Sequence, residues 1–174
     1  MRVSAKADYA ARAAAELSTA TDKPIKADRI AAAQDIPAKF LETILLELKH
    51  AGIVRSQRGP EGGYALARPA EDISVADVIR AVDGPLANVR GDRPENMEYN
   101  GAAEPLTDVW IAVRAALRDI LETTTLANLR DGELPTRVAE LADDPEAWVS
   151  LGRIRGAAPT GGRKTQPKTS SAKS

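Results

Sequence analysis

The sequence predicts a mainly α-helical fold with one small β-hairpin, arranged as a winged helix-turn-helix domain followed by a long helix suited to dimerisation. The composition is rich in alanine and only 3% aromatic, which favours helices. Apolar residues recur at helical spacing in several separate segments. One glycine-rich stretch lies between two short apolar runs directly after a pair of helices, as the hairpin of a winged helix does.

Three helices are expected before the glycine-rich stretch. The first spans 4–18 and begins at Ser4, a good capping residue. The second spans about 26–34. The third spans about 37–51, because Pro37 suits a first helical turn and Gly52 suits a helix end. The second and third helices, joined by a tight break, predict a helix-turn-helix.

The glycine-rich stretch, 59–63, is predicted to turn between strands at 53–56 and 64–67. Such a loop could instead hold phosphate, but a phosphate loop leads straight into a helix and carries GxGxxG or GK[ST], which are absent here. We therefore interpret the hairpin as the wing of a DNA-binding domain. A fourth helix should follow Ser74, with a capping box to Asp77, and end at Gly84-Pro85.

The C-terminal half is predicted to contain a linker or flexible loop, a long helix over 106–123, and two short helices around 125–130 and 135–142. The apolar pattern of the long helix is equally compatible with packing within the chain and with dimerisation. The predicted domains are 1–84 (winged helix), 85–104 (loop), 105–145 (dimerisation helix and short helices) and 146–174 (extension, with a disordered basic tail from about 156). The apolar stripe of the long helix consists of Leu106, Val109, Trp110, Val113, Leu117, Ile120 and Leu121.

Composition excludes several classes of function. With no cysteine, disulfides, zinc fingers, cysteine-ligated iron–sulfur clusters and thiol nucleophiles are ruled out. The single histidine, His50, is better explained as a solvent or phosphate contact than as a metal ligand, and no catalytic set of residues is recognisable, so we expect no metal, no cofactor and no enzyme. No apolar run approaches membrane-spanning length, and we expect a cytoplasmic protein. Residues 81–155 carry 8 Lys/Arg against 14 Asp/Glu, so nucleic acid should bind the N-terminal half or the basic tail.

Several blocks resemble one bacterial family. They are "VSAKADYAARAAAELS", "FLETILLELKHAGIVRSQRGPEGGYALARP", "ISVADVIRAVDGP" and "TTLANL". Over about residues 1–130 they are similar to the Rrf-two family of winged helix-turn-helix transcriptional regulators, of the IscR, NsrR and CymR types. The resemblance implies a homodimer whose long helices cross and which binds a palindromic operator in double-stranded DNA.

The exposed positions of the third helix and the wing are the predicted DNA contacts. Lys39 could donate to guanine, Glu42 could accept from cytosine, and Thr43 could reach a phosphate or a thymine methyl group. Many relatives carry a small hydroxyl residue where Lys39 stands, which indicates a different operator. Arg58 matches the arginine that family members insert into the minor groove. The full predicted set is Arg2, Ser4, Lys6, Ala38, Lys39, Glu42, Thr43, Arg55, Ser56, Gln57, Arg58 and Gly59.

The segment that carries the sensor in relatives departs from their pattern. Cluster-binding members place three cysteines in the part corresponding to about 88–105, which here has none, and Asp8, an extra ligand in one branch, cannot hold a cluster alone. We expect a repressor without an iron–sulfur cluster, controlled by a small molecule near Met97, Tyr99 and Trp110 or by a partner protein, as in CymR-type members. The alternative is a winged helix that serves as a protein-interaction module, with its acidic half facing a basic partner.

Overall fold

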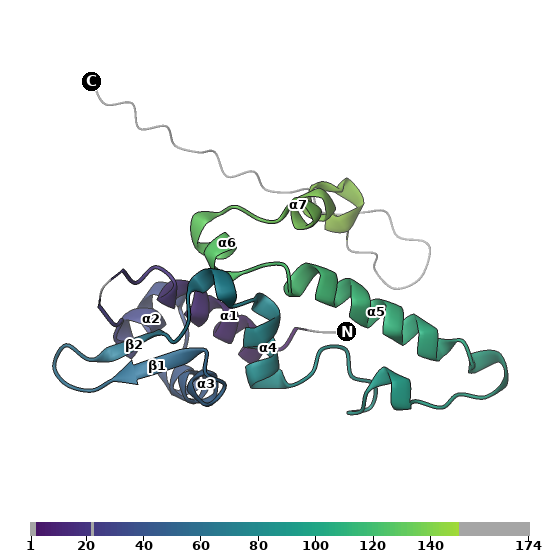
Figure 1. The fold of residues 1–174 in the computed structure, drawn as a ribbon, viewed down its shortest axis with the longest axis horizontal. Coiled ribbons are helices and arrows are strands. Elements are labelled where there is room, and N and C mark those ends of the chain that lie inside the picture. Colours follow the sequence, from purple (N-terminus) through teal and green to yellow (C-terminus); the bar gives the residue numbers. More distant parts are fainter. Residues whose placement is uncertain (1–2, 22, 150–174) are drawn as a thin grey trace, which may run out of the picture. The chain divides into compact units, whose positions relative to one another are not determined.

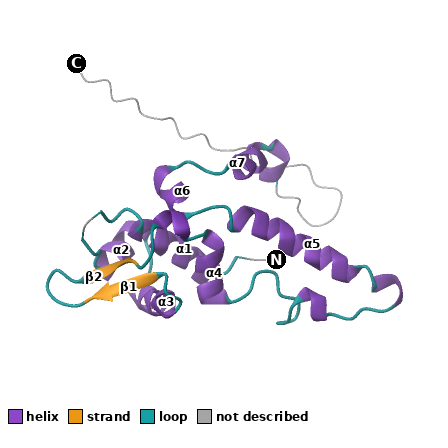
Figure 2. Ribbon diagram, in the orientation of Figure 1, coloured by secondary structure: helices purple, strands orange, loops and turns teal. Residues whose placement is uncertain are grey.

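The computed structural model describes residues 3–21 and 23–149, and the chain divides into two compact units, Met1–Pro135 and Thr136–Ser174 (Figure 1). The described part is mainly helical with one antiparallel two-stranded sheet, which confirms the predicted fold class (Figure 2). The α-helices and strands are α1 (Ala5–Leu17), α2 (Ala27–Gln34), α3 (Ala38–His50), β1 (Val54–Gln57), β2 (Gly63–Leu66), α4 (Val75–Asp83), α5 (Leu106–Leu121), α6 (Leu126–Asp131) and α7 (Thr136–Asp143).

Helix α1 is the centre of the first unit. It packs against α2, α3, α4 and α6, and four of its alanines are at most 1% exposed. Small side chains allow four neighbours to approach one helix closely, which explains why so alanine-rich a segment carries the core. Ser4 caps the helix as predicted, because its hydroxyl accepts a hydrogen bond from the Ala7 amide at 2.9 Å.

The helix-turn-helix consists of α2 and α3, joined by a turn in which Asp35 adopts a left-handed conformation (φ 49°). Arg12 on α1 holds this turn, since its guanidinium donates to the backbone carbonyls of Gln34 and Asp35. Helix α3 begins one residue later than expected, with Pro37 as its cap residue. Its buried side is formed by Leu41, Ile44, Leu45 and Leu48.

The glycine-rich stretch forms the turn of a hairpin, as the sequence predicts. Strands β1 and β2 pair antiparallel in the register Val54–Leu66 to Gln57–Gly63. Tyr64 also bonds to Ile25, with both backbone hydrogen bonds at 2.8 Å, so the segment before α2 is fastened to the wing. Gly63 is required at this contact, because a Cβ there would lie 2.6 Å from the Ile25 carbonyl oxygen.

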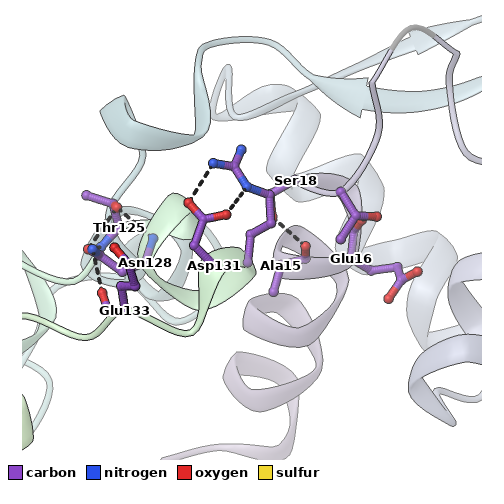
Figure 3. Close-up of polar contacts among 9 residues, drawn as sticks. Ala15, Glu16, Ser18, Thr125, Asn128, Asp131 and Glu133 are labelled. Carbon is purple, nitrogen blue, oxygen red and sulfur yellow. Dashed lines mark hydrogen bonds and ion pairs between the residues drawn. The ribbon is translucent and has the colours of Figure 1, made fainter. Parts of the chain in front are cut away.

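Helix α4 begins with the predicted capping box between Ser74 and Asp77, and Ile73 and Val78 on either side of it are fully buried. A second capping box, between Thr125 and Asn128, opens α6 (Figure 3). The two helix starts are joined by a short β-bridge, in which the Val75 amide donates to Thr124 at 2.8 Å and the Leu126 amide to Ile73 at 2.9 Å. The chain therefore returns to the start of α4 after completing α5.

Residues 86–104 were expected to form a linker or flexible loop, and they contain two 3-10 helices, Pro94–Asn96 and Gly101–Ala103. Side-chain bonds fasten this loop to α5: Arg114 pairs with Glu95 at 2.6 Å, and Trp110 donates to the Tyr99 hydroxyl at 3.1 Å. The loop has little periodicity because its order comes from contacts with a helix later in the chain.

The second unit is described over residues 136–149. It contains α7 and a 3-10 helix, Pro145–Trp148, which contact each other. The Trp148 indole donates to the Ala142 carbonyl at 2.6 Å. The predicted basic tail lies outside the described residues.

Candidate nucleic-acid interface

Helix α3 presents a polar face on the side opposite its buried leucines. The predicted residues Ala38, Lys39, Glu42 and Thr43 are all exposed there. The Thr43 hydroxyl has a long contact of 3.5 Å to the Lys39 carbonyl, whereas the Lys39 and Glu42 side chains make no hydrogen bond or ion pair within the described residues. The exposed face continues beyond the predicted set through Leu46, Lys49 and His50.

The wing divides its predicted residues between two faces. Successive side chains of a strand point to opposite sides, so Arg55 and Gln57 lie on one face of β1 and Ser56 on the other. The Arg55 Nε donates to the Leu66 carbonyl at 3.2 Å, which directs this side chain along the hairpin. Arg55, Ser56 and Gln57 therefore cannot all contact the same run of phosphates.

Arg58 and Gly59 lie in the turn at the wing tip and are exposed. Arg58 makes no hydrogen bond or ion pair with any residue that the structure describes, so its charge is available to a ligand. Beside it lies a hollow of about 510 Å³ between the wing and the start of α2, lined by Ser56, Gln57, Arg58, Gly59 and Lys26 among others.

Lys26 is a further candidate contact, outside the set predicted from the sequence. It is the residue that precedes the first turn of α2, and the Ile25–Tyr64 bridge holds it next to the wing. A cation beside the free amides of a helix N-terminus is well suited to a phosphate. The available signal was a lysine directly before the first helix of the helix-turn-helix.

The N-terminal residues are occupied by contacts within the chain. Besides capping α1, Ser4 donates from its hydroxyl to Asp83. The Lys6 ammonium lies 2.7 Å from a Glu47 carboxylate oxygen and donates to the Val82 carbonyl at 2.8 Å. A phosphate contact from Lys6 would have to replace these bonds. Arg2 lies outside the described residues.

Helix α5 carries the predicted apolar stripe, and none of its 16 residues is buried. Val109 is 48% exposed, whereas Leu106, Trp110, Val113, Leu117, Ile120 and Leu121 are half-buried against the loop 86–104 and α4. Leu117 and Leu121 line an apolar hollow of about 340 Å³ beside α1 and α4. The chain alone thus covers only part of this stripe.

The loop that corresponds to the cluster segment does not fit an iron–sulfur cluster. It has no thiol, and two of its carboxylates, those of Asp92 and Glu95, already have partners. Asp92 accepts hydrogen bonds from the Arg93 amide at 2.7 Å and Asn96 at 2.9 Å, and these lower its pKa. A hydrogen bond from its own amide and the bond from Arg114 lower the pKa of Glu95. Asp8 pairs with Arg12 at 3.2 Å.

Within residues 3–21 and 23–149, no group of three or more His, Cys, Asp or Glu side chains could hold a metal ion. The same residues contain no helix long and apolar enough to cross a membrane.

Comparison with known proteins places the whole first unit in one group. A family model described as "Iron-dependent Transcriptional regulator" (Rrf2, the Rrf-two family) matches residues 3–132. A helix-turn-helix-type transcriptional regulator of Mycobacterium tuberculosis strain H37Rv is 53% identical over 151 residues, which cover 86% of this chain and 94% of that protein. The regulator CymR of Bacillus subtilis strain 168 is 32% identical over 137 residues, covering 76% and 94%.

Solved structures agree. CymR of B. subtilis, described as its global cysteine regulator, superposes with a TM-score of 0.65 at 30% identity, covering 76% of this chain and 98% of CymR. T. potens IscR gives a TM-score of 0.62 at 31% identity, covering 76% of this chain and 89% of IscR.

Proposed function

Because the chain belongs to the Rrf2 family of helix-turn-helix transcriptional regulators, we propose that it is a repressor that binds a palindromic operator as a homodimer, without an iron–sulfur cluster. In this proposal α3 enters the major groove and the wing tip approaches the minor groove. Arg58, Lys39 and Glu42 read the bases, and Lys26 and Arg55 contact phosphates.

The observation that carries the proposal is the exposed surface of α3 and the wing tip. Lys39, Glu42 and Arg58 all stand on it, exposed and without partners among the described residues. Three arginines elsewhere in this unit, Arg12, Arg80 and Arg114, are instead held in ion pairs. An unpaired donor and acceptor set on one helix and an adjacent hairpin suits base edges and phosphates.

The test is selection of bound duplexes from a random pool, followed by titration of the selected sequence and a scrambled duplex at several salt concentrations. We expect a palindrome, and a binding constant that falls by about 10³-fold or more between 50 and 200 mM salt, as for proteins with several phosphate contacts. An interaction module for a basic protein would instead select no duplex and bind DNA no better than an unrelated acidic protein.

The absence of a cluster is supported by the donor set. An iron–sulfur cluster needs thiolates, and the chain has no cysteine to supply them. Protein reconstituted with iron and sulfide should therefore stay colourless and release no stoichiometric iron. Strong visible absorption after reconstitution would contradict this part of the proposal.

We propose that the loop 86–104 receives the regulatory signal as a small-molecule site. Two hydrogen bonds join this loop to α5: Trp110 donates to the Tyr99 hydroxyl, and the Thr107 hydroxyl donates to the Met97 carbonyl at 3.2 Å. A pocket of about 280 Å³ lies between residues 87–90 and α5, where Trp110 and Val113 line it. A ligand here should change Trp110 fluorescence, and Trp110→Phe should abolish the change. Control by a partner protein would instead appear as co-purification with no small-molecule response.

A further inference from the structure

One residue on the exposed face of α3 does not match its surroundings. Leu46 is 51% exposed and lies between Thr43 and Lys49. Lys39, Thr43, Leu46 and His50 follow one another at helical spacings of four, three and four, so they form a single row. Leu46 is the only large apolar residue in that row.

Its position excludes a role in the core of the described chain. The buried residues Leu41, Ile44, Leu45 and Leu48 lie on the opposite side of the helix. Phe40, the other large exposed apolar residue of α3, lies to the side, where its ring is 6.3 Å from that of Tyr9. Single exposed leucines are common on proteins, so exposure alone carries nothing. The informative fact is that Leu46 stands at the middle of the row that the proposed function directs at DNA.

The major groove offers an apolar side chain one apolar partner, the C5-methyl group of thymine. We propose that Leu46 contacts a thymine methyl group in each half-site and so helps to set sequence specificity, an inference that rests on the proposed function. Leu46 lies seven residues after Lys39, or about 10 Å along the helix.

The experiment removes the methyl group from the DNA and the side chain from the protein separately. Each thymine of the selected operator is replaced in turn, in both half-sites, by deoxyuridine, which lacks only the C5-methyl group. Binding is titrated for the wild-type protein, Leu46→Ala, and the matched control Leu129→Ala, which removes a half-exposed leucine of α6. Circular dichroism and thermal unfolding establish that both variants are folded.

We expect the affinity of the wild type to fall about sixteen-fold when one symmetric pair of thymines is replaced by deoxyuridine. Each of the two missing methyl groups should account for about fourfold, because it leaves a buried contact. Leu46→Ala should bind the thymine operator more weakly and lose this response at that pair, while keeping the responses at all others. Leu129→Ala should reproduce the wild-type profile.

Two results would overturn the inference while leaving the proposed function intact: a specific operator with no thymine whose methyl group matters, or an unchanged deoxyuridine profile in Leu46→Ala. Failure to select any operator would instead overturn the proposed function, and the inference with it.

Discussion

Single side chains at the wing tip decide how tightly the proposed regulator should hold its operator. Arg58→Ala should weaken operator binding by about 1–3 kcal/mol, because it removes the only tip cation that has no partner in the described chain. It should also make the fall of log affinity with log salt less steep, reducing the magnitude of the slope by about one. Titration at four salt concentrations measures both.

The control for this prediction is Arg93→Ala, which removes an exposed arginine in the loop 86–104. It should leave the affinity and the slope unchanged. Equal losses in the two variants would mean that Arg58 acts only through the overall charge of the protein.

The exposure and the contacts of single residues were only partly predictable from the sequence. The helical row on α3 predicts the exposure of Lys39, Glu42 and Thr43, since it follows from the spacing of the leucines on the other side. The surroundings of Lys6 could not be predicted, because its partners Glu47 and Val82 lie on two other helices. The sequence does not indicate Leu46, because an apolar residue is not an obvious DNA contact.

At the scale of elements, the wing depends on one close backbone approach. Gly63→Ala should push a methyl group into the Ile25 carbonyl and destabilise the protein by about 1–3 kcal/mol. Hydrogen exchange at the Ile25 and Tyr64 amides, each of which donates to the other residue's carbonyl, should accelerate. Gly132→Ala is the control: its φ of 71° is strained for alanine but nothing lies within 4 Å, so exchange at these two amides should stay at the wild-type rate.

The attachment of the loop 86–104 to α5 should weaken in acid. The pKa of Glu95 is lowered by the hydrogen bond from its own amide and by Arg114. A carboxyl whose pKa is lower in the folded state stabilises that state above its unfolded pKa, and the stabilisation is lost as pH falls through the folded pKa. In Glu95→Gln the loop should therefore be attached to α5 more weakly than in the wild type near neutral pH. In strong acid the two proteins should show the same attachment.

Trp110 fluorescence reports this contact, because the indole bonds to Tyr99 in the same loop. Glu98→Gln, which alters an exposed carboxylate of the loop with no described ion pair, is the control. A constant difference between Glu95→Gln and the wild type across all pH values would contradict an ionic contact.

Element boundaries were predicted to within one or two residues where caps and periodicity fix them, as at Ser4 and Ser74. The two 3-10 helices of the loop were not predicted. They are held by pairs such as Glu95–Arg114, which a local pattern cannot reveal.

At the scale of the whole molecule, the stripe on α5 should be completed by a second chain. Val109→Glu combined with Val113→Glu places two charges on the stripe and should leave monomers in sedimentation equilibrium. Operator affinity should then fall by about 100-fold or more, because two half-sites are no longer bound by one linked pair. Ala115→Glu, on the exposed opposite face, should stay dimeric. Monomeric wild-type protein would contradict the proposed assembly directly.

The bridge between Ser74 and Thr125 allows the segment between them to vary in length and sequence. Helix α4 stays packed against α1 and α3, whereas the loop 86–104 and α5 form an excursion that ends where the chain returns to this bridge. The entropy of closing such an excursion grows slowly, so that doubling its length raises the free energy by only about 0.6 kcal/mol. That is less than the loss of about 0.8 kcal/mol for one buried methylene group. Residues of the loop 86–104 can thus be inserted, removed or exchanged while the packing of α1, α2, α3 and α4 is kept.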